Sequence, residues 1–199
     1  AILAGGKSSR MGRDKALLEI GGKPFIRHIA GALSQVFEQV VVVSDHGDRY
    51  AFLGLQTYED VFKECGPLGG IHSALKNSST KKLFFAPCDI PFLDRRVIQY
   101  LLDARGEEDV TIFSSGDVLQ PLCGIYDSRI LPTVERHLRR GRCSVLNVLG
   151  DVRTACVATP SDNGMSRALV NINTVAEYSH HLSCFPPPTE LISTVVKLP

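Results

Sequence analysis

The sequence opens with Ala1-Ile2-Leu3-Ala4-Gly5-Gly6-Lys7-Ser8-Ser9-Arg10-Met11-Gly12-Arg13-Asp14-Lys15, a short apolar run that leads into glycines and cations. Glycines let backbone N–H groups approach a ligand closely, and successive N–H groups that point one way bind anions. Four cations within nine residues, Lys7 to Lys15, repel one another unless an anion lies between them. The stretch therefore predicts a strand followed by a loop that binds a polyphosphate.

The same stretch contains part of a P-loop pattern. Gly6-Lys7-Ser8 matches the end of G-x-x-x-x-G-K-[ST], but Ala1 stands where the first glycine belongs. The apolar run also continues to Leu3, whereas a P-loop would require the strand to end before residue 1. A G-x-G-x-x-G dinucleotide motif is absent from the sequence. These patterns disfavour both P-loop NTPases and dinucleotide-binding proteins.

Beyond the opening stretch, apolar runs alternate with segments of helical spacing. The continuous apolar runs predict strands covered on both faces, at 1–4, 39–44, 82–87 and 109–113. The segments of helical spacing between them lie at 24–37, 67–77 and 92–105. This order predicts a three-layer, Rossmann-like α/β domain with a mostly parallel sheet and right-handed crossovers.

The pattern changes after residue 115. Residues 118–126 hold Pro121 and Gly124, which suit an antiparallel edge strand or a β-bulge. We expect helices at 128–140 and 143–149 and a last strand at 152–158. Thr174 and Glu177 form a capping-box pattern before a final helix at 175–182. We therefore predict one domain over 1–182 and a Pro-containing tail over 183–199.

Composition narrows the class of protein. A net charge of +1 on 199 residues gives no indication of nucleic-acid binding. Since no run of about 18 apolar residues occurs, no membrane span is predicted. The six cysteines are scattered without zinc-knuckle spacing, so we expect reduced thiols and a cytoplasmic location.

Four segments together resemble one family. The run L-A-G-G-x-S-x-R-M-G-x-D-K over residues 3–15 is similar to the signature of MobA-like nucleotidyltransferases of the molybdenum cofactor guanylyltransferase type. Three more segments match that family in order: Gly66-Pro67-Leu68-Gly69-Gly70-Ile71, Pro87-Cys88-Asp89-Ile90-Pro91-Phe92 and Asn171-Ile172-Asn173-Thr174. The resemblance implies Mg²⁺-dependent transfer of GMP from GTP to molybdopterin cofactor, with release of pyrophosphate. Such a reaction depends mainly on positioning and charge neutralisation, so we expect no dedicated general base.

The resemblance also implies roles for single residues. Lys15 and Arg10 contact the triphosphate, and with Asp89 they form the catalytic set. Asp89 follows a predicted central strand and holds Mg²⁺, with Asn173 as a second oxygen ligand, because Mg²⁺ prefers hard oxygen donors. The implied nucleotide contacts are Leu3, Ala4, Gly5, Gly6, Gly12, Lys15, Ser44, Asp60, Gly66, Pro67, Leu68 and Asp89.

The choice of substrate rests on fewer residues. Guanine-specific members carry L-A-G-G and G-P-L, as this chain does, whereas related cytidylyltransferases tend to carry L-A-A-G. Ser44-Asp45 stands where Asn is common in the family, which leaves one base or ribose contact open. The pterin side involves Pro121–Gly124 and the basic stretch Arg136–Arg142, and partner enzymes would deliver or accept the cofactor. The alternatives are a cytidylyltransferase of the same cofactor, a sugar-phosphate-type nucleotidyltransferase, and a GTP-binding module without transfer activity.

Overall fold

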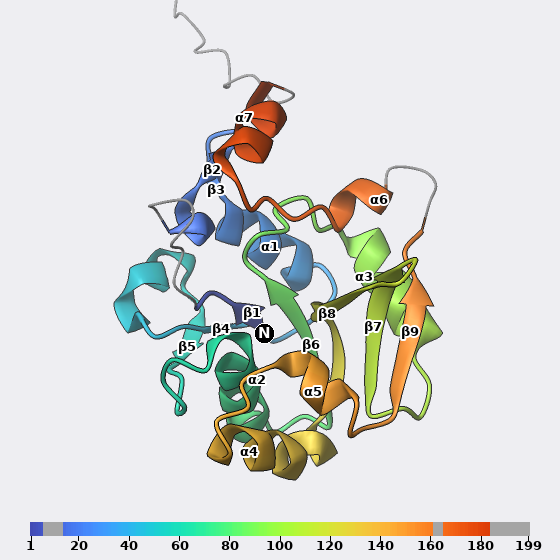
Figure 1. Ribbon diagram of the computed structural model, residues 1–199. Coiled ribbons are helices and arrows are strands. Elements are labelled where there is room, and N and C mark those ends of the chain that lie inside the picture. The colour runs from blue at the N-terminus through green and yellow to red at the C-terminus, as the bar shows by residue number, and fades with distance from the viewer. Residues whose placement is uncertain (6–13, 161–164, 184–199) are drawn as a thin grey trace, which may run out of the picture.

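The computed structural model describes residues 1–5, 14–160 and 165–183 (Figure 1). Its main sheet has seven strands in the order β5-β4-β1-β6-β8-β7-β9. Their bounds are β1 Ile2–Leu3, β4 Val41–Val43, β5 Gln56–Tyr58, β6 Lys82–Pro87, β7 Val110–Ser115, β8 Val118–Asp127 and β9 Thr154–Ala158. Only β8 runs antiparallel to its neighbours in this sheet, while the other pairings are parallel. The predicted mostly parallel sheet with an antiparallel strand is confirmed.

Helices cover both faces of the sheet, which gives three layers. One face packs on α1 (Phe25–Ser34) and α3 (Arg95–Ala104), and the other on α2 (Gly66–Asn77), α4 (Leu131–Arg139) and α5 (Val145–Leu149). In β6, Phe84 and Ala86 join the first core cluster, whereas Leu83 and Phe85 join the second. Successive residues of a strand point to opposite faces of the sheet, and here both faces are covered by helices and buried. This is why β6 reads as a continuous apolar run.

Strand β8 corrects one expectation. It pairs with β6 on one side and β7 on the other, so it is a central strand and the edge-strand alternative is wrong. The bulge alternative is confirmed, because the register shifts from Ile112 opposite Gly124 to Phe113 opposite Gln120. Pro121 lies inside this irregularity, where its missing N–H breaks no ladder bond. At Gly124 an added Cβ would lie 2.6 Å from Ile112 Cγ2, so the neighbouring strand leaves no room for a side chain.

Several short elements have no counterpart among the predictions. A two-stranded hairpin pairs β2 (Glu19–Ile20) with β3 (Lys23–Pro24) through Gly21 and Gly22, whose φ angles are 59° and 73°. Such angles at both turn residues favour glycine. The 3₁₀ helices η1 (Lys15–Leu17) and η2 (Gly47–Leu53) and the short helix α6 (Met165–Ala168) are likewise unpredicted. In contrast, η3 (Ser128–Ile130) begins the segment predicted as a helix at 128–140, and α7 (Val175–Ser183) confirms the final helix predicted at 175–182.

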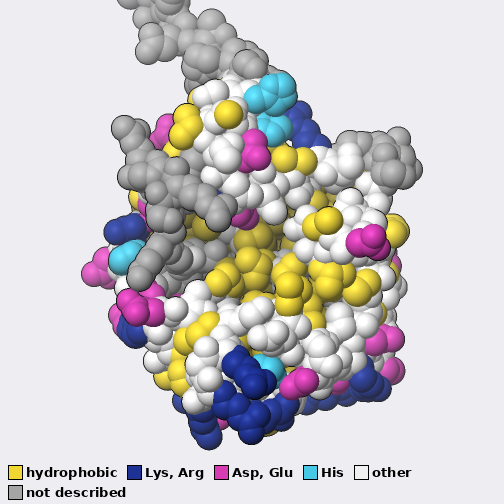
Figure 2. Space-filling model, in the orientation of Figure 1, with side chains coloured by type: hydrophobic (Ala, Val, Ile, Leu, Met, Phe, Trp, Pro, Cys, Tyr) yellow, Lys and Arg dark blue, Asp and Glu magenta, His cyan; other side chains and the backbone are white. Residues whose placement is uncertain are grey.

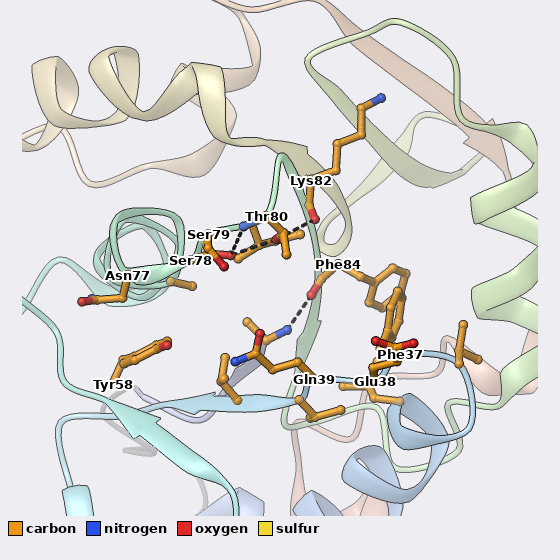
Figure 3. Close-up of a pocket in the computed structure, with 17 residues that line it drawn as sticks. Phe37, Glu38, Gln39, Tyr58, Asn77, Ser78, Ser79, Thr80, Lys82 and Phe84 are labelled. Atoms are coloured by element: carbon orange, nitrogen blue, oxygen red, sulfur yellow. Dashed lines mark hydrogen bonds between the residues drawn. The ribbon is translucent and has the colours of Figure 1, made fainter.

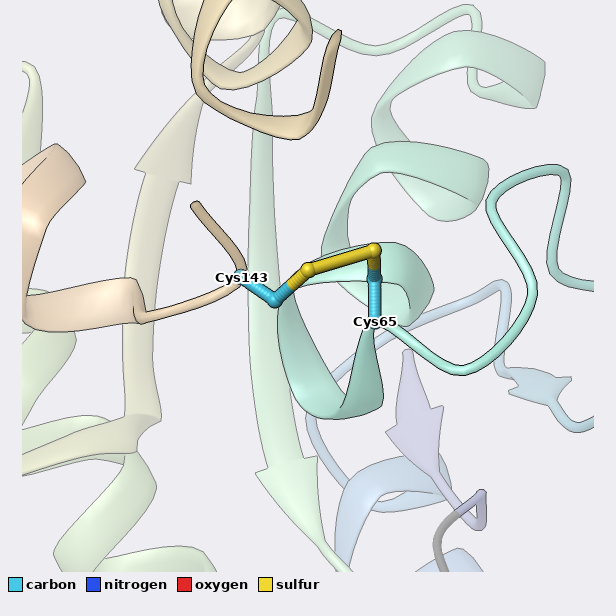
Figure 4. The surroundings of a disulfide bond; sticks show 2 residues. All are labelled: Cys65 and Cys143. Carbon is cyan, nitrogen blue, oxygen red and sulfur yellow. A yellow bond between two sulfur atoms is a disulfide. The ribbon is translucent and has the colours of Figure 1, made fainter. Parts of the chain in front are cut away.

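One cysteine pair contradicts the expectation of reduced thiols. Cys65 and Cys143, 78 residues apart in sequence, form a disulfide between the start of α2 and the connection from α4 to α5 (Figure 4). Packing of α2 against α4 brings the two Cα atoms to 4.9 Å, within the range of a disulfide. Cys88, Cys123 and Cys156 are free, and Cys184 lies outside the described residues. Spacing along the chain could not indicate a pair that tertiary packing creates.

Two further expectations concern the chain as a whole. In the part of the chain that the structure describes, no helix combines the length and apolar character needed to cross a bilayer. The predicted tail lies beyond the described residues from position 184 onward, so the boundary between domain and tail stays a prediction.

Candidate functional site

The candidate residues gather along the edge where β1, β4, β5 and β6 end. Backbone hydrogen bonds extend the sheet just past these strands: Ala4 N–H donates to the Val43 carbonyl at 2.9 Å, and Cys88 N–H donates to the Leu3 carbonyl at 3.2 Å. Asp89 lies two residues beyond the end of β6, at the carboxyl edge where open α/β sheets bind ligands. The residues placed at this edge or in the first turn of α2 are Leu3, Ala4, Gly5, Ser44, Asp60, Gly66, Pro67, Leu68 and Asp89.

Lys15, Asp89 and Asn173 meet at one point of this edge. The Lys15 ammonium donates a hydrogen bond of 2.7 Å to Asn173 Oδ1, across 158 residues of sequence. The same Nζ lies 4.0 Å from Asp89 Oδ2. The side chains of Lys15 and Asp89 are 18% and 22% exposed, so a ligand can still reach both. The structure thus brings together a cation, a carboxylate and an amide oxygen that the sequence keeps far apart.

Asn173 is held in place by the cap of α7. Its backbone N–H and that of Thr174 donate to Glu177 Oε2 at 2.7 and 3.0 Å. Glu177 N–H donates in turn to Thr174 Oγ1 at 3.2 Å, so the predicted capping box is confirmed. Ile172 N–H donates to the Asp89 carbonyl at 2.8 Å, which fixes this segment beside β6.

The surroundings of Asp89 suit a hard cation. Burial raises the pKa of the Asp89 carboxyl, and the nearby Lys15 ammonium opposes that shift. Asn171 Oδ1 is buried and has no hydrogen-bond donor in the described part of the chain. Within the same described residues no cluster of three or more His, Cys, Asp or Glu side chains could bind a metal. One carboxylate with amide oxygens and ligand phosphates is an ordinary donor set for Mg²⁺, so these residues fit that ion.

A second carboxylate, Asp60, is buried close to three glycines. Asp60 is 7% exposed, and its Oδ1 has no hydrogen-bond partner among the described residues. A Cβ added to Gly5, Gly69 or Gly70 would lie 3.6–3.7 Å from an Asp60 oxygen, so the backbone passes close to the carboxylate. Burial, and then the Asp45 carboxylate, raise the pKa of Asp60 to about 6, while Lys63 opposes the shift. Asp60 is therefore an unused acceptor that can take hydrogen bonds from a ligand.

Some predicted contacts are restricted to the backbone or already engaged. The side chains of Leu3 and Leu68 lie in the core, which leaves only their backbone for a ligand. Ser44 is buried, and its Oγ accepts a hydrogen bond of 3.0 Å from His46 N–H. Arg10, Gly6 and Gly12 lie outside the described residues, so their predicted roles stay predictions.

The residues considered for the pterin side are spread over two places. Pro121–Gly124 lie in the bulge of β8, and Lys and Arg side chains gather over α4 at the lower edge of Figure 2. Arg136 pairs with Asp151 at 3.0 Å, and Arg139 pairs with Glu135 at 2.7 Å. The disulfide of Cys143 places the end of the basic stretch next to the start of α2. This proximity to the nucleotide edge comes from the packing of α2 against α4, which no local sequence pattern indicates.

A cavity of about 510 Å³ lies at the opposite, amino edge of the sheet (Figure 3). It is lined by the first residues of β4 and β6 and by the ends of α1 and α2, including Phe37, Tyr58, Ser78 and Phe84. None of the candidate site residues lines this cavity. This cavity is separate from the candidate site.

Two residues that support the site, Tyr50 and Arg49, are not indicated by any sequence pattern. Asp14, next to Lys15, accepts hydrogen bonds from the Tyr50 hydroxyl and from Arg49, both in η2. No motif marks Tyr50 or Arg49, and η2 itself lies in a stretch without helical or strand periodicity.

Comparisons with known proteins agree on one family. Residues 1–154 match the family model described as a MobA-like NTP transferase domain. The chain is 36% identical to a probable molybdenum cofactor guanylyltransferase of Carboxydothermus hydrogenoformans over 188 residues, covering 93% of this chain and 95% of the relative. It is 34% identical to the molybdenum cofactor guanylyltransferase of Vibrio parahaemolyticus, covering 88% of this chain and 90% of the relative.

Solved structures share the fold. A crystal structure of a protein from Aquifex aeolicus has a TM-score of 0.77 and 30% identity, covering 87% of this chain and 91% of that one. The structure of molybdopterin-guanine dinucleotide biosynthesis protein A from Archaeoglobus fulgidus has a TM-score of 0.79 at 22% identity, covering 92% and 96% of the two chains.

Proposed function

The chain belongs to the MobA-like NTP transferase family, and we propose that it transfers GMP from GTP to the terminal phosphate of molybdopterin cofactor. The products would be molybdopterin guanine dinucleotide and pyrophosphate. The observation that carries this proposal is the meeting of Lys15, Asp89 and Asn173 at the carboxyl edge of the sheet. Relatives named as guanylyltransferases, aligned over most of both chains, support the choice of reaction.

The proposed step exchanges one phosphorus–oxygen bond for another. An oxygen of the cofactor phosphate attacks the α-phosphorus of GTP, and the bond from that phosphorus to the oxygen bridging to the β-phosphate breaks. The bonding electrons leave with pyrophosphate. A phosphate monoester is mostly dianionic near neutral pH, so the attacking oxygen needs no base to remove a proton. The protein's part is to align the two phosphates and offset their charge.

Lys15 supplies the protein's own positive charge in this site. Its ammonium lies at the edge, anchored by Asn173 and facing Asp89, where it would contact the α-phosphate. Asp89 and Asn173, with the unpartnered Asn171 Oδ1 close by in the chain, would hold Mg²⁺. When bound, this ion offsets the negative charge of the triphosphate. These residues together would orient the α-phosphorus toward the acceptor.

Asp60 supports guanine over the pyrimidine bases. The Watson–Crick edge of guanine carries two adjacent donors, N1–H and the N2 amino group, and a carboxylate can accept both. Cytosine offers only its N4 amino group at the corresponding edge. Asp60 Oδ1 is buried without a hydrogen-bond partner in the described protein, which costs free energy until a ligand donates to it. A base with one donor fewer than guanine should therefore bind much more weakly.

A direct assay tests the proposal. Purified protein is mixed with Mg²⁺, molybdopterin cofactor and GTP, CTP or UTP, and pyrophosphate and dinucleotide are quantified. We expect pyrophosphate and guanine dinucleotide in equal amounts with GTP, and much slower turnover with CTP or UTP. Preference for CTP would identify a cytidylyltransferase. Binding of GTP in calorimetry without pyrophosphate release would identify a binding module, and either result would overturn the proposal.

The raised pKa of Asp60 predicts how GTP affinity depends on pH. Because guanine donors need the carboxylate, lowering the pH through the Asp60 pKa of about 6 should raise the Kd for GTP, toward about tenfold per pH unit well below it. The stability of the unliganded protein should depend on pH in the opposite direction from its affinity for GTP. Burial favours the neutral form, so the free energy of unfolding should fall as pH rises from the ordinary value of 3.8 to about 6.

Calorimetry from pH 5 to 8 measures this dependence, with Asp60→Asn as the control. The γ-phosphate of GTP titrates in the same range, but its effect is common to both proteins and cancels in the ratio of their Kd values. A ratio that stays constant across this pH range would show that Asp60 does not contact the base.

A further inference from the structure

A single hydroxyl contacts one residue on each side of the glycine- and cation-rich stretch 6–13, Ala4 before it and Asp14 after it. The Tyr50 hydroxyl lies 2.8 Å from Asp14 Oδ2 and 3.1 Å from the Ala4 carbonyl oxygen. Tyr50 is 1% exposed and packs in the core cluster that also holds Ala4 and Ala16. Ala4 directly follows β1, and Asp14 is the N-cap of η1. The hydroxyl therefore ties the end of the sheet to the start of the helix that carries Lys15.

Asp14 is the acceptor on which this contact converges. Its Oδ2 also accepts from Arg49 Nη1 at 2.9 Å, and its Oδ1 accepts from Ala16 N–H at 3.0 Å. Burial, and then the Asp14 carboxylate, raise the pKa of Tyr50 well above its ordinary range, so the hydroxyl keeps its proton. One O–H can donate to one acceptor at a time, and the charged Asp14 is the stronger acceptor.

The orientation of Lys15 depends on Asp14. The Asp14 carboxylate caps η1 through Ala16 N–H, and the Asp14 carbonyl accepts from Leu17 N–H at 3.1 Å. These bonds fix the backbone from which the Lys15 side chain reaches Asn173 and Asp89. Arg49 alone cannot replace the hydroxyl, because its side chain is 41% exposed and, among the described residues, it donates to Asp14 and forms no hydrogen bond with Ala4. The path from Tyr50 to the ammonium thus passes through one carboxylate and one turn of helix.

We propose that Tyr50 is a positioning residue that acts through Asp14 to hold Lys15 at the reacting phosphate. The catalytic part of this inference rests on the proposed transfer reaction, whereas the structural part does not. The ring of Tyr50 belongs to the core in any case, so the inference concerns the hydroxyl alone. Removing it should misplace Lys15 slightly while leaving the fold intact.

Tyr50→Phe isolates the hydroxyl because the ring is retained. We expect kcat for pyrophosphate release to fall by about 10- to 100-fold, as for a catalytic group displaced by about 1 Å, with the KM for the acceptor nearly unchanged. Tyr100→Phe is the matched control, because Tyr100 is exposed on α3 and its ring stacks on Phe113. Wild-type kcat in Tyr50→Phe, in an enzyme that is otherwise active, would overturn the proposal.

A double-mutant cycle tests the path. If Tyr50 acts through Asp14, Tyr50→Phe in an Asp14→Asn background should cause little further loss. Additive losses from the two changes would show that the hydroxyl acts elsewhere, and would also overturn the proposal.

Amide hydrogen exchange separates this inference from the transfer reaction, because it needs no substrate. Exchange of the Ala16 and Leu17 amides, followed by NMR, should quicken in Tyr50→Phe and stay unchanged in Tyr100→Phe. Faster exchange together with an inactive wild-type enzyme would support the positioning role and refute the transfer reaction. Unchanged exchange would overturn the positioning role, whatever the turnover.

Discussion

Replacing Asp89 with asparagine should lower kcat for pyrophosphate release by about three orders of magnitude, which corresponds to about 4 kcal/mol of lost charge stabilisation. The amide keeps the size of the side chain but removes the charge that would bind Mg²⁺ most strongly. Burial already disfavours the ionised carboxyl, as its raised pKa shows, so the thermal midpoint should change little. The assay is a continuous measurement of pyrophosphate across a range of Mg²⁺ concentrations.

Asp103→Asn is the matched control, because Asp103 is exposed on α3 and bonds only Gln99 among the described residues. It should keep wild-type kcat and an unchanged dependence on Mg²⁺. In Asp89→Asn the concentration of Mg²⁺ needed for half-maximal rate should rise sharply. Wild-type turnover at the wild-type Mg²⁺ requirement would remove Asp89 from the metal site.

Replacing Lys15 with methionine should lower kcat by about 100- to 1000-fold, the usual effect of removing one donor from a developing charge. Methionine keeps most of the apolar stem, so the loss reflects the ammonium rather than packing. Arginine should not restore the rate, because its planar group cannot occupy the same point between Asn173 and Asp89. Single-turnover kinetics with saturating GTP separates this effect from weaker binding.

Lys23→Met, a change at an exposed lysine of β3, is the control for the loss of one positive charge. A decrease below about tenfold in Lys15→Met, or about 1.4 kcal/mol, would be too small for a residue that stabilises the transition state. Because Lys15 Nζ and Asp89 Oδ2 lie 4.0 Å apart, the effects of the two substitutions on the activation free energy should also be non-additive.

The longer elements of the fold could be predicted because their patterns are local. Strand β6 is apolar on both faces, and α2 and α3 carry a core-facing stripe, so each can be identified without knowing its neighbours. The hairpin of β2 and β3 and the three-residue β5 are too short to show any periodicity. The place of β8 between β6 and β7 depends on pairing partners, which no local pattern encodes.

The site likewise contains residues that sequence motifs indicate and residues that only tertiary packing brings together. Lys15 and Asp89 lie in motifs that the sequence displays, and the structure places them in one site. Tyr50 lies in a 3₁₀ helix without periodicity, and its contact with Asp14 arises only from packing. The disulfide between Cys65 and Cys143 and the unpartnered oxygen of Asp60 are likewise products of tertiary structure.

Strand β1 pairs with β4 and β6, so Ile2 contacts Val42 and Ala86, and Lys15 bonds Asn173 across 158 residues. During synthesis β1 therefore precedes both of its partner strands, and Lys15 precedes Asn173 by most of the described chain. At about 5–20 residues per second, roughly 8 to 32 seconds separate the synthesis of Lys15 from that of Asn173, 158 residues later. A polypeptide released before that point lacks Asn173, so premature termination should leave no fragment able to assemble these three groups.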